Sequence, residues 1–193
     1  MKTLGALIAP LKATGLLSRS GARLDNDVSI DHLSQDSRKI TRNGLCVAVR
    51  GNIADGHMFI DKAVNNGAVA IVCEEVPGNA HERFAGTYFV RVKDSRHALA
   101  VLARNFYDLP DQELQVFGVT GTNGKTTTSA LIHHMLTKLG VGAGLIGTIE
   151  ERIGEKAVPA TLTTPDPVHI HGLFRLMREE NCSHAVMEVS SHA

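Results

Sequence analysis

The sequence predicts an α/β protein with two domains, and three features of the chain indicate this fold. From residue 45 to residue 92, short runs of apolar and β-branched residues alternate with segments whose apolar residues have helical spacing. A helix-ending proline at position 110 and a polar patch follow, which places a domain boundary near residues 108–113. Beyond it, an apolar run passes through a glycine-rich turn into another helical segment. We therefore expect one domain over residues 1–110 and a second over residues 111–193.

The first domain should contain a small sheet with helices between its strands. Three strands are expected, at residues 45–49, 68–73 and 87–92. Apolar residues at helical spacing between Ile60 and Val64 predict a helix before the second strand, with Gly67 at its end. Asp94 suits the N-cap of a further helix. The buried face of that helix would comprise Leu99, Leu102, Ala103 and Phe106.

Composition and the first residues indicate a cytoplasmic protein without a polyanionic partner. Pro10 and Lys12 interrupt the mildly apolar start before a secretory segment or a membrane span could form, so we expect an amphipathic helix there. The 20 Lys and Arg residues balance the 20 Asp and Glu residues, which argues against nucleic acid or an anionic membrane as a partner. Cys46, Cys73 and Cys182 lack metal-ligand spacing and are expected to be reduced core thiols.

The second domain should continue the α/β pattern. Three strands are expected, at residues 114–120, 144–149 and 184–190. A helix should run from Lys125 to Leu139 and stop at Gly140, and another should follow Asp166 as N-cap and Pro167 as first helical residue. The apolar face of this last helix would be Ile170, Leu173, Phe174 and Met177. Because about 80 residues hold fewer strands than a doubly wound sheet usually needs, we expect a fragment of a longer protein.

The glycine-rich turn after residues 116–119 is the most informative segment. In a phosphate-binding loop, backbone N–H groups of the turn and helix N-terminus point at the phosphates, a lysine neutralises the β/γ oxygens and a hydroxyl binds Mg²⁺. Lys125 and Thr126 have these last two positions. The predicted nucleotide-binding residues are Gly121, Thr122, Asn123, Gly124, Lys125, Thr126 and Thr127. Val119 stands where the general pattern has glycine, and a turn that binds nothing is the alternative.

Glu188 ends the last predicted strand, where a parallel sheet would bring it beside the phosphate loop. It could bind Mg²⁺ there, together with Thr126. A solvated or salt-bridged carboxylate at the strand end is an equally good interpretation of the sequence alone. Lys125 and Glu188 are accordingly the candidate catalytic residues, and Thr126 and Glu188 the candidate metal ligands.

Two strings in the second domain resemble segments of the Mur ligases. Residues 120–127, Thr-Gly-Thr-Asn-Gly-Lys-Thr-Thr, resemble the ATP loop of this family and of the related folylpolyglutamate and cyanophycin synthetases. These enzymes join a carboxylate to an amine through an acyl phosphate. Residues 188–193, Glu-Val-Ser-Ser-His-Ala, resemble the segment of the branch that adds the third peptide residue. The resemblance implies that Glu188 binds Mg²⁺ and that Ser190 contacts the substrate.

Three segments of the first domain look like the uridine-diphosphate-binding region of the same family. They are Asp36-Ser37-Arg38, residues 45–51 and Asp55-Gly56-His57. The resemblance implies that the UDP part of the substrate contacts Ser37, Asn52, Ile53 and Ala54. Without the resemblance, an ordinary turn with a surface ion pair is the better interpretation of Asp-Ser-Arg.

The turn at residues 162–167 has a structural and a functional interpretation. Capping of the next helix explains Asp166 and Pro167 without any ligand. It does not explain the two preceding threonines. In the Mur ligases this turn grips the muramoyl-peptide substrate, which implies substrate contacts by Leu162, Thr163 and Thr164.

Together, these resemblances imply a UDP-binding α/β domain followed by an incomplete P-loop, Rossmann-like ATPase domain with a mostly parallel sheet. The implied enzyme uses ATP and Mg²⁺ to join meso-diaminopimelate or L-lysine to UDP-N-acetylmuramoyl-L-alanyl-D-glutamate in peptidoglycan synthesis. We expect a monomer, inactive without the downstream domain that selects the amino acid. The alternatives are another ligase of the superfamily, such as the sibling at the next peptide step or a folylpolyglutamate synthetase, and a stand-alone nucleotide-binding module.

Overall fold

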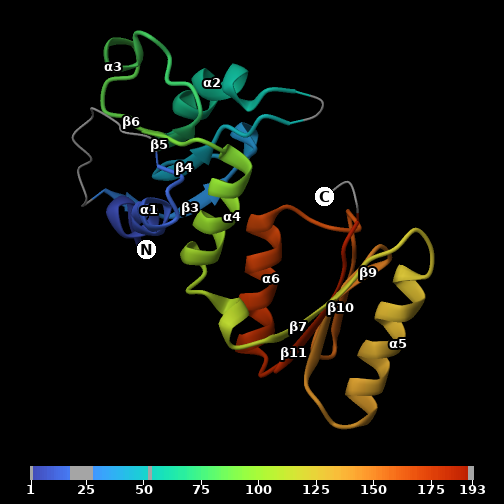
Figure 1. The fold of residues 1–193 in the computed structure, drawn as a ribbon. Coiled ribbons are helices and arrows are strands. Elements are labelled where there is room, and N and C mark those ends of the chain that lie inside the picture. The colour runs from blue at the N-terminus through green and yellow to red at the C-terminus, as the bar shows by residue number, and fades with distance from the viewer. Residues whose placement is uncertain (1, 18–27, 52–53, 191–193) are drawn as a thin grey trace. The chain divides into compact units, whose positions relative to one another are not determined.

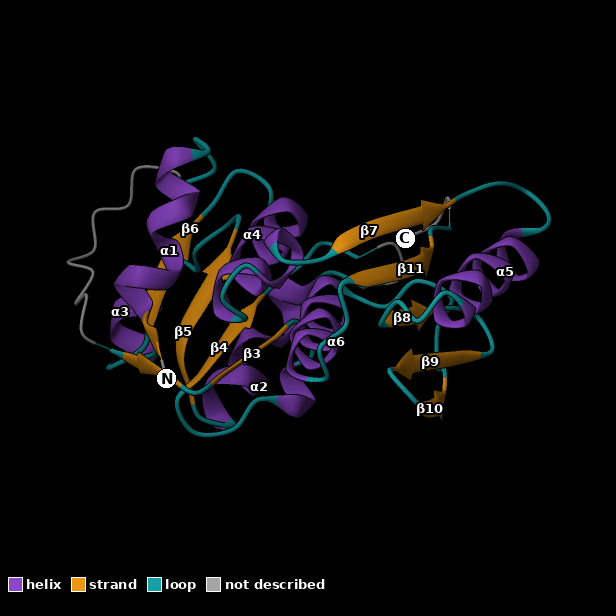
Figure 2. Ribbon diagram, turned by 90° about the horizontal axis from the view of Figure 1, so that it is seen from below, coloured by secondary structure: helices purple, strands orange, loops and turns teal. Residues whose placement is uncertain are grey.

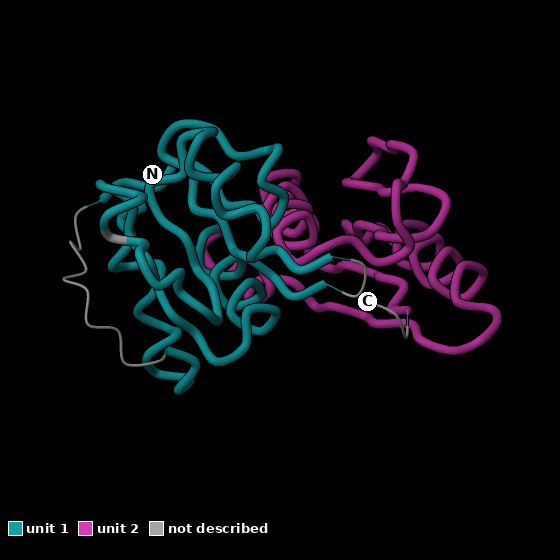
Figure 3. Tube along the Cα trace, turned by 90° about the horizontal axis from the view of Figure 1, so that it is seen from above, with its two compact units in different colours: residues 1–106 teal, residues 107–193 magenta. Residues whose placement is uncertain are grey.

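The computed structural model describes residues 2–17, 28–51 and 54–190. The chain forms two compact units, Met1–Phe106 and Tyr107–Ala193 (Figure 3). Each unit has a sheet of its own, and each has a cluster of buried apolar side chains. In the described part of the chain, no helix is both long enough and apolar enough to cross a membrane.

Four parallel strands form the main sheet of the first unit, in the order β3-β4-β5-β6 (Figure 2). They span His32–Ser34 (β3), Gly44–Val47 (β4), Ala68–Cys73 (β5) and Tyr88–Arg91 (β6). The last three confirm the strands predicted from apolar runs. The sequence does not predict β3, because His-Leu-Ser is short and mainly polar. A separate antiparallel pair joins β1 (Lys2–Thr3) to β2 (Ser29–Ile30).

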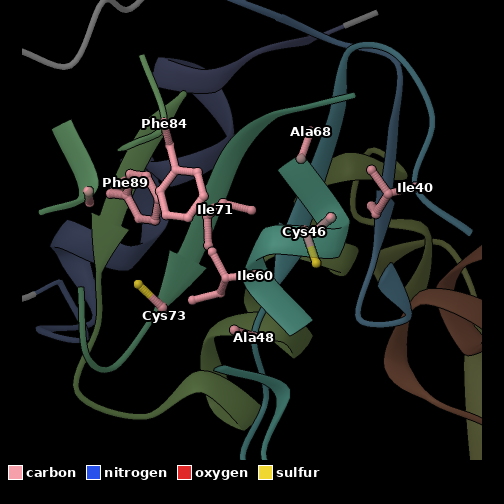
Figure 4. Close-up of a cluster of buried hydrophobic side chains, with 11 residues drawn as sticks. Ile40, Cys46, Ala48, Ile60, Ala68, Ile71, Cys73, Phe84 and Phe89 are labelled. Atoms are coloured by element: carbon pink, nitrogen blue, oxygen red, sulfur yellow. The ribbon is translucent and has the colours of Figure 1, made fainter. Parts of the chain in front are cut away.

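Helices cover both faces of this sheet (Figure 1). They are α1 (Leu4–Ala13), α2 (Ile60–Asn65), α3 (Ala80–Arg83) and α4 (Ser95–Phe106), with short 3₁₀ turns η1 (Ser37–Lys39) and η2 (Gly56–Phe59). On the face of α2 and α3, a core cluster includes Cys46, Ile71 and Phe89 (Figure 4). Alternate residues such as Val47 and Val72 are fully buried on the opposite face, which α1 and α4 cover (Figure 1).

The N-terminal helix α1 confirms the helix predicted there, although it contains Pro10 and its exposed positions are mostly alanine rather than polar. A proline lacks the N–H that would donate to the carbonyl four residues earlier, here that of Ala6. The Asn105 side chain of α4 donates to this carbonyl instead, with 2.8 Å between Nδ2 and the oxygen. The apolar side of α1 is buried and comprises Leu4, Leu7, Ile8 and Leu11. A neighbouring helix thus compensates for the proline.

On α4, Leu99, Leu102 and Ala103 are buried as predicted, whereas Phe106 is only half-buried. Other local predictions for the first unit hold. Asp94 caps α4, since its Oδ1 accepts a hydrogen bond of 2.9 Å from the His97 N–H. Gly67 follows α2 with a φ of +106°, a conformation that favours glycine. The three cysteines, one of them in the second unit, are free and buried as expected. Burial raises the pKa of the Cys46 and Cys73 thiols to about 12.

Five strands form the sheet of the second unit, in the order β10-β9-β8-β11-β7. They span Gln115–Val119 (β7), Ala143–Ile146 (β8), Glu150–Ile153 (β9), Lys156–Pro159 (β10) and His184–Glu188 (β11). Strands β7, β11 and β8 are parallel, as the sequence predicts. The prediction that one strand runs to Ile149 is wrong, because β8 ends at Ile146 and the chain turns back into the antiparallel hairpin of β9 and β10.

Helices α5 (Lys125–Lys138) and α6 (Pro167–Glu179) lie on opposite faces of this sheet (Figure 1). Both confirm predicted helices. Asp166 caps α6 by accepting from the Val168 and His169 N–H groups, at 2.9 and 3.1 Å. The core beneath α6 comprises Leu114, Ile146, Leu173, Phe174, Met177, Cys182 and Ala185. A short turn, η3 (Pro110–Gln112), precedes β7.

Strand order determines where the functional residues of the second unit meet. Strand β11 lies between β7 and β8, and its last residue, Glu188, pairs in register with Val119 at the end of β7. The carboxyl ends of parallel strands share one edge of the sheet, where α/β proteins bind ligands. The phosphate loop, the turn after β8 and Glu188 therefore lie together at this edge.

Candidate functional site

The predicted phosphate loop connects β7 to α5 with the geometry that its glycines allow. Gly121 has a φ of +147° and Gly124 a φ of +79°, values that side-chain-bearing residues rarely adopt. Gly124 is the N-cap of α5, and no side chain caps that end of the helix. The free N–H groups at a helix N-terminus suit an anion. Thr122 and Asn123 complete the exposed turn, and Lys125, Thr126 and Thr127 begin the helix.

The side chain of Lys125 lies back across the loop. Its Nζ donates a hydrogen bond of 2.8 Å to the carbonyl oxygen of Gly121. This contact holds the ammonium group at the inner side of the turn. A phosphate in the turn would therefore meet both the lysine and the backbone N–H groups.

Glu188 is a buried carboxylate with neutral hydrogen-bond donors around it. Its side chain is only 1% exposed. Oε2 accepts from the hydroxyls of Thr126 and Thr148, both at 3.0 Å, and Oε1 accepts from the Thr148 N–H at 2.9 Å. In the described part of the chain it makes no ion pair, so the solvated or salt-bridged carboxylate considered from the sequence is not what the structure shows. A buried carboxylate without a positive partner is costly, which favours a bound cation.

Of the two threonines in the predicted substrate turn, Thr164 bonds directly to the end of β11, and Thr163 connects to Glu188 through Thr148. Thr164 Oγ1 donates to the Glu188 carbonyl at 3.0 Å and accepts from the Ser190 N–H at 3.0 Å. Thr163 Oγ1 lies 3.1 Å from Thr148 Oγ1. Leu162, the first predicted residue of this turn, is 59% exposed. The second unit thus gathers Thr163, Thr164 and Ser190 around the same strand end as Glu188.

Metal ligands of the classical nitrogen and sulfur kind do not gather here. Among the described residues, no group of three or more His, Cys, Asp and Glu side chains could hold a metal ion. The oxygens of Thr126 and Glu188 form a smaller set. Mg²⁺ is usually held by one or two protein oxygens together with phosphates and water, so this pair fits Mg²⁺ better than Zn²⁺.

A separate pocket lies in the first unit, where the sequence predicts UDP contacts. Its volume is about 420 Å³. Its walls are formed by Gln35, Asp36, Ser37, Arg38, Val49, Gly51, Ala54, Gly56, Phe59 and Lys62. Ser37 and Ala54 are among the predicted residues, whereas Asn52 and Ile53 lie outside the described residues. The structure therefore brings two of the four predicted UDP contacts to one pocket.

The charges on the walls of this pocket are unevenly paired. The Arg38 guanidinium donates to both oxygens of Asp36, from Nε to Oδ1 at 2.9 Å and to Oδ2 at 3.2 Å, and from Nη2 to Oδ2 at 2.8 Å. The Arg38 guanidinium lowers the pKa of Asp36 to about 2. Lys62 makes no ion pair with any residue that the structure describes. The ion pair expected for Asp-Ser-Arg is present, and Lys62 is a further, uncompensated cation.

The Asp55-Gly56-His57 string has a structural role in the first unit. His57 Nδ1 lies 2.6 Å from Asp55 Oδ1, and Nε2 accepts from the Glu74 N–H at 3.0 Å. The imidazole thereby ties η2 to the end of β5. A side chain at Gly56 would meet the Val49 backbone at 2.7 Å. The string resembles a binding motif and here shapes the wall of the pocket.

The structure adds three residues to the candidate sites that the sequence does not predict. Thr148 contacts Glu188 and Thr163, and Phe59 and Lys62 line the pocket of the first unit. None belongs to a recognisable motif. For Thr148 the available signal is its place just after a parallel strand, at the edge where ligands bind.

Comparison with known proteins identifies both units. Residues 29–107 match the family model described as Mur ligase family, catalytic domain, and residues 119–193 match the Mur ligase middle domain. Two curated relatives are named UDP-N-acetylmuramoyl-L-alanyl-D-glutamate–2,6-diaminopimelate ligase. The one from Cytophaga hutchinsonii is 46% identical over 178 residues, which are 92% of this chain and 36% of the relative. The one from Chlorobaculum tepidum is 51% identical over 158 residues, 82% of this chain and 30% of the relative.

Solved structures agree with this match. A structure of a ligase with the same name superimposes with a TM-score of 0.74 at 24% identity, over 91% of this chain and 34% of the other. The MurF ligase from Thermotoga maritima in complex with ADP gives a TM-score of 0.56 at 28% identity, over 83% and 32%. This chain spans about a third of the length of these proteins. The two family models and the relatives show that the chain belongs to the Mur ligase family.

Proposed function

We propose that this chain provides the UDP-binding domain and part of the ATP-binding domain of a ligase that adds the third residue of the peptidoglycan peptide. The observation that carries the proposal is Glu188, which is buried, has no positive partner among the described residues, and accepts a hydrogen bond from the phosphate-loop hydroxyl of Thr126. Relatives at 46–51% identity carry the name of the diaminopimelate-adding ligase, which favours diaminopimelate over lysine. Because the chain spans about a third of these relatives, we assign it binding sites rather than the complete reaction.

The loop residues from Gly121 to Thr127 would bind the phosphates of ATP. No described side chain caps the N-terminus of α5, so its backbone N–H groups suit this role, and Lys125 needs only to turn from the Gly121 carbonyl toward the β/γ oxygens. Thr126 and Glu188 would hold Mg²⁺, which when bound would neutralise charge on the phosphates. The residues of the chain thus orient the γ-phosphate and offset its charge.

The proposed reaction activates a carboxylate before the new bond forms. A free carboxylate oxygen of UDP-N-acetylmuramoyl-L-alanyl-D-glutamate attacks the γ-phosphorus, and ADP leaves with the electrons of the broken P–O bond. The amine of the diamino acid then attacks the acyl carbon, phosphate leaves and the nitrogen loses a proton. Thr163, Thr164 and Ser190 would position the peptide end, since they lie at the strand end that carries Glu188.

The pocket of the first unit would bind the uridine diphosphate. Ser37 and Ala54 line it, and Lys62 supplies a positive charge that no described residue neutralises. The Arg38 guanidinium is already bonded to both carboxylate oxygens of Asp36, so Lys62 is the better partner for a diphosphate. Phe59, 45% exposed, offers an apolar surface to a base or sugar.

Calorimetric titration of this chain tests the proposal. Wild-type chain should bind UDP-N-acetylmuramoyl-L-alanyl-D-glutamate, and Ser37→Ala should weaken that binding about tenfold without changing the affinity for Mg²⁺-ADP. Folate is the rival ligand expected for a folylpolyglutamate synthetase, and the tripeptide product is the one expected for the next-step ligase. The second is included because the chain is similar to a MurF structure. A folded chain that bound ATP and no UDP-sugar would overturn the substrate assignment.

A further inference from the structure

Thr148 stands at the centre of the hydrogen bonds around Glu188. Its N–H donates to Glu188 Oε1 at 2.9 Å, and its hydroxyl lies 3.0 Å from Glu188 Oε2 and 3.1 Å from Thr163 Oγ1. Thr148 is the second residue after β8, separated from its end by Gly147. One side chain therefore connects the proposed metal ligand to the proposed substrate turn.

Gly147 completes this cradle because it has no side chain. A Cβ at this position would lie 2.8 Å from Glu188 Oε1, which is closer than carbon and oxygen can approach. The carboxylate therefore lies against the backbone of Gly147 and accepts hydrogen bonds from Thr148. Gly147 and Thr148, together with the Thr126 hydroxyl, fix the positions of the Glu188 oxygens.

Counting protons gives these hydrogen bonds a direction. A threonine hydroxyl carries one proton, whereas an ionised carboxylate only accepts. The Thr148 proton therefore goes to Glu188 Oε2, and Thr163 donates its own proton to Thr148. The chain of donors runs from Thr163 through Thr148 to Glu188, and bonds in such a chain strengthen one another.

We propose that Thr148 is a positioning residue that couples metal–nucleotide binding at Glu188 to the order of the Thr163 turn; this rests on the proposed function. Thr148 holds the Glu188 carboxylate toward the phosphate loop and leaves the lone pairs of Thr163 for a ligand. Thr163 then accepts a hydrogen bond from an N–H or O–H group of the substrate, rather than donating to a carboxylate. Residues that orient a metal ligand typically change metal affinity 10–100-fold when replaced.

The test compares Thr148→Val with Thr148→Ser in this chain. Valine keeps the shape and the backbone N–H and removes the hydroxyl, whereas serine keeps the hydroxyl. Thr148 is an exposed residue, so both variants should fold. Calorimetry with ADP in Mn²⁺ should show about tenfold weaker binding for Thr148→Val and recovery in Thr148→Ser. In EDTA, all forms should bind ADP within about twofold of each other.

A matched control and a second variant make the test decisive. Thr137→Val removes a hydroxyl of an exposed residue that donates to the His133 carbonyl within α5, and it should leave Mn²⁺-ADP binding unchanged. Thr163→Val breaks the other end of the chain and should weaken Mn²⁺-ADP binding about threefold, with no further loss when combined with Thr148→Val. Even if Thr148→Val failed to fold, wild-type binding in Thr163→Val would overturn the coupling.

Failure of this inference is distinguishable from failure of the proposed function. Wild-type chain that binds Mn²⁺-ADP while Thr148→Val binds it equally well would refute the role of Thr148 and leave the nucleotide site intact. Wild-type chain that binds ADP no better with Mn²⁺ than with EDTA would refute the metal site itself. Loss of binding in EDTA as well as in Mn²⁺ would show that Thr148 shapes the loop generally, and the positioning role would be withdrawn.

Discussion

The two units each carry a carboxylate at a candidate binding site, and the two carboxylates have opposite surroundings. Asp36 in the first unit is bound on two sides by Arg38, and the neighbouring Lys62 adds a positive charge. Glu188 in the second unit is buried among hydroxyls and an N–H, with no cation among the described residues. The first site contains a cation, Lys62, that no described residue pairs with, so it suits an anion. The second lacks one and suits a metal ion.

The largest expected effect concerns the phosphate loop. Lys125→Ala should weaken binding of Mg²⁺-ADP to this chain by about 100-fold, because a charged donor to the β-phosphate oxygens is lost. Calorimetry measures it. Lys138→Ala, in the last turn of the same helix, removes an equal charge far from the loop and is the control. Equal affinities in wild type and Lys125→Ala would mean that the turn does not bind phosphate as proposed.

A smaller effect separates the two cations of the first-unit pocket. Lys62→Ala should weaken binding of UDP about tenfold and leave uridine binding nearly unchanged, because only the diphosphate needs the charge. Arg38→Ala should cost less, since Arg38 is already bound to Asp36. Lys39, which does not line the pocket, gives the control Lys39→Ala. A larger loss in Arg38→Ala than in Lys62→Ala would reverse this assignment.

The smallest effect is a dependence of stability on pH. The pKa of Asp36 is lowered from 3.8 to about 2, so its contribution to stability is present above pH 4 and is lost as pH falls from 4 toward 2. Asp36→Asn should destabilise the chain at pH 7 by less than about 1 kcal/mol, because the pair is near the surface. Urea unfolding of both forms at pH 7 and pH 2.5 checks this. A difference that grew at pH 2.5 would contradict it.

Local signals explain which elements could be predicted. Asp166 and Pro167 specify the start of α6 within a few residues, and the glycine-rich turn specifies the strand-to-helix junction at Lys125. The hairpin of β9 and β10 gave no such signal. Its first strand reads Glu-Glu-Arg-Ile, and its pairing depends on the neighbouring strand β8. Elements whose pairing depends on tertiary neighbours escape a sequence pattern.

The candidate site residues likewise fall into those that the sequence predicts and those that it does not. The loop residues were predictable because their roles follow from one contiguous motif. The partnership of Thr148 with Glu188 joins residues 40 positions apart, and only the order of the strands brings them together. Likewise, the sequence alone does not determine the surroundings of Glu188, since burial depends on the strands and turns packed around it. The pairing of Arg38 with Asp36 could be predicted because both lie in one turn.

The most direct test of the contrast between the units is the Mg²⁺ dependence of ADP binding in wild type and Glu188→Gln. The substitution keeps the shape of the side chain and removes its charge. If Glu188 holds the cation, Mg²⁺ should strengthen ADP binding to the wild-type chain by about tenfold or more. In Glu188→Gln, Mg²⁺ should leave the ADP affinity almost unchanged. Equal strengthening by Mg²⁺ in both forms would contradict the account, because the buried carboxylate would then have no part in binding the metal.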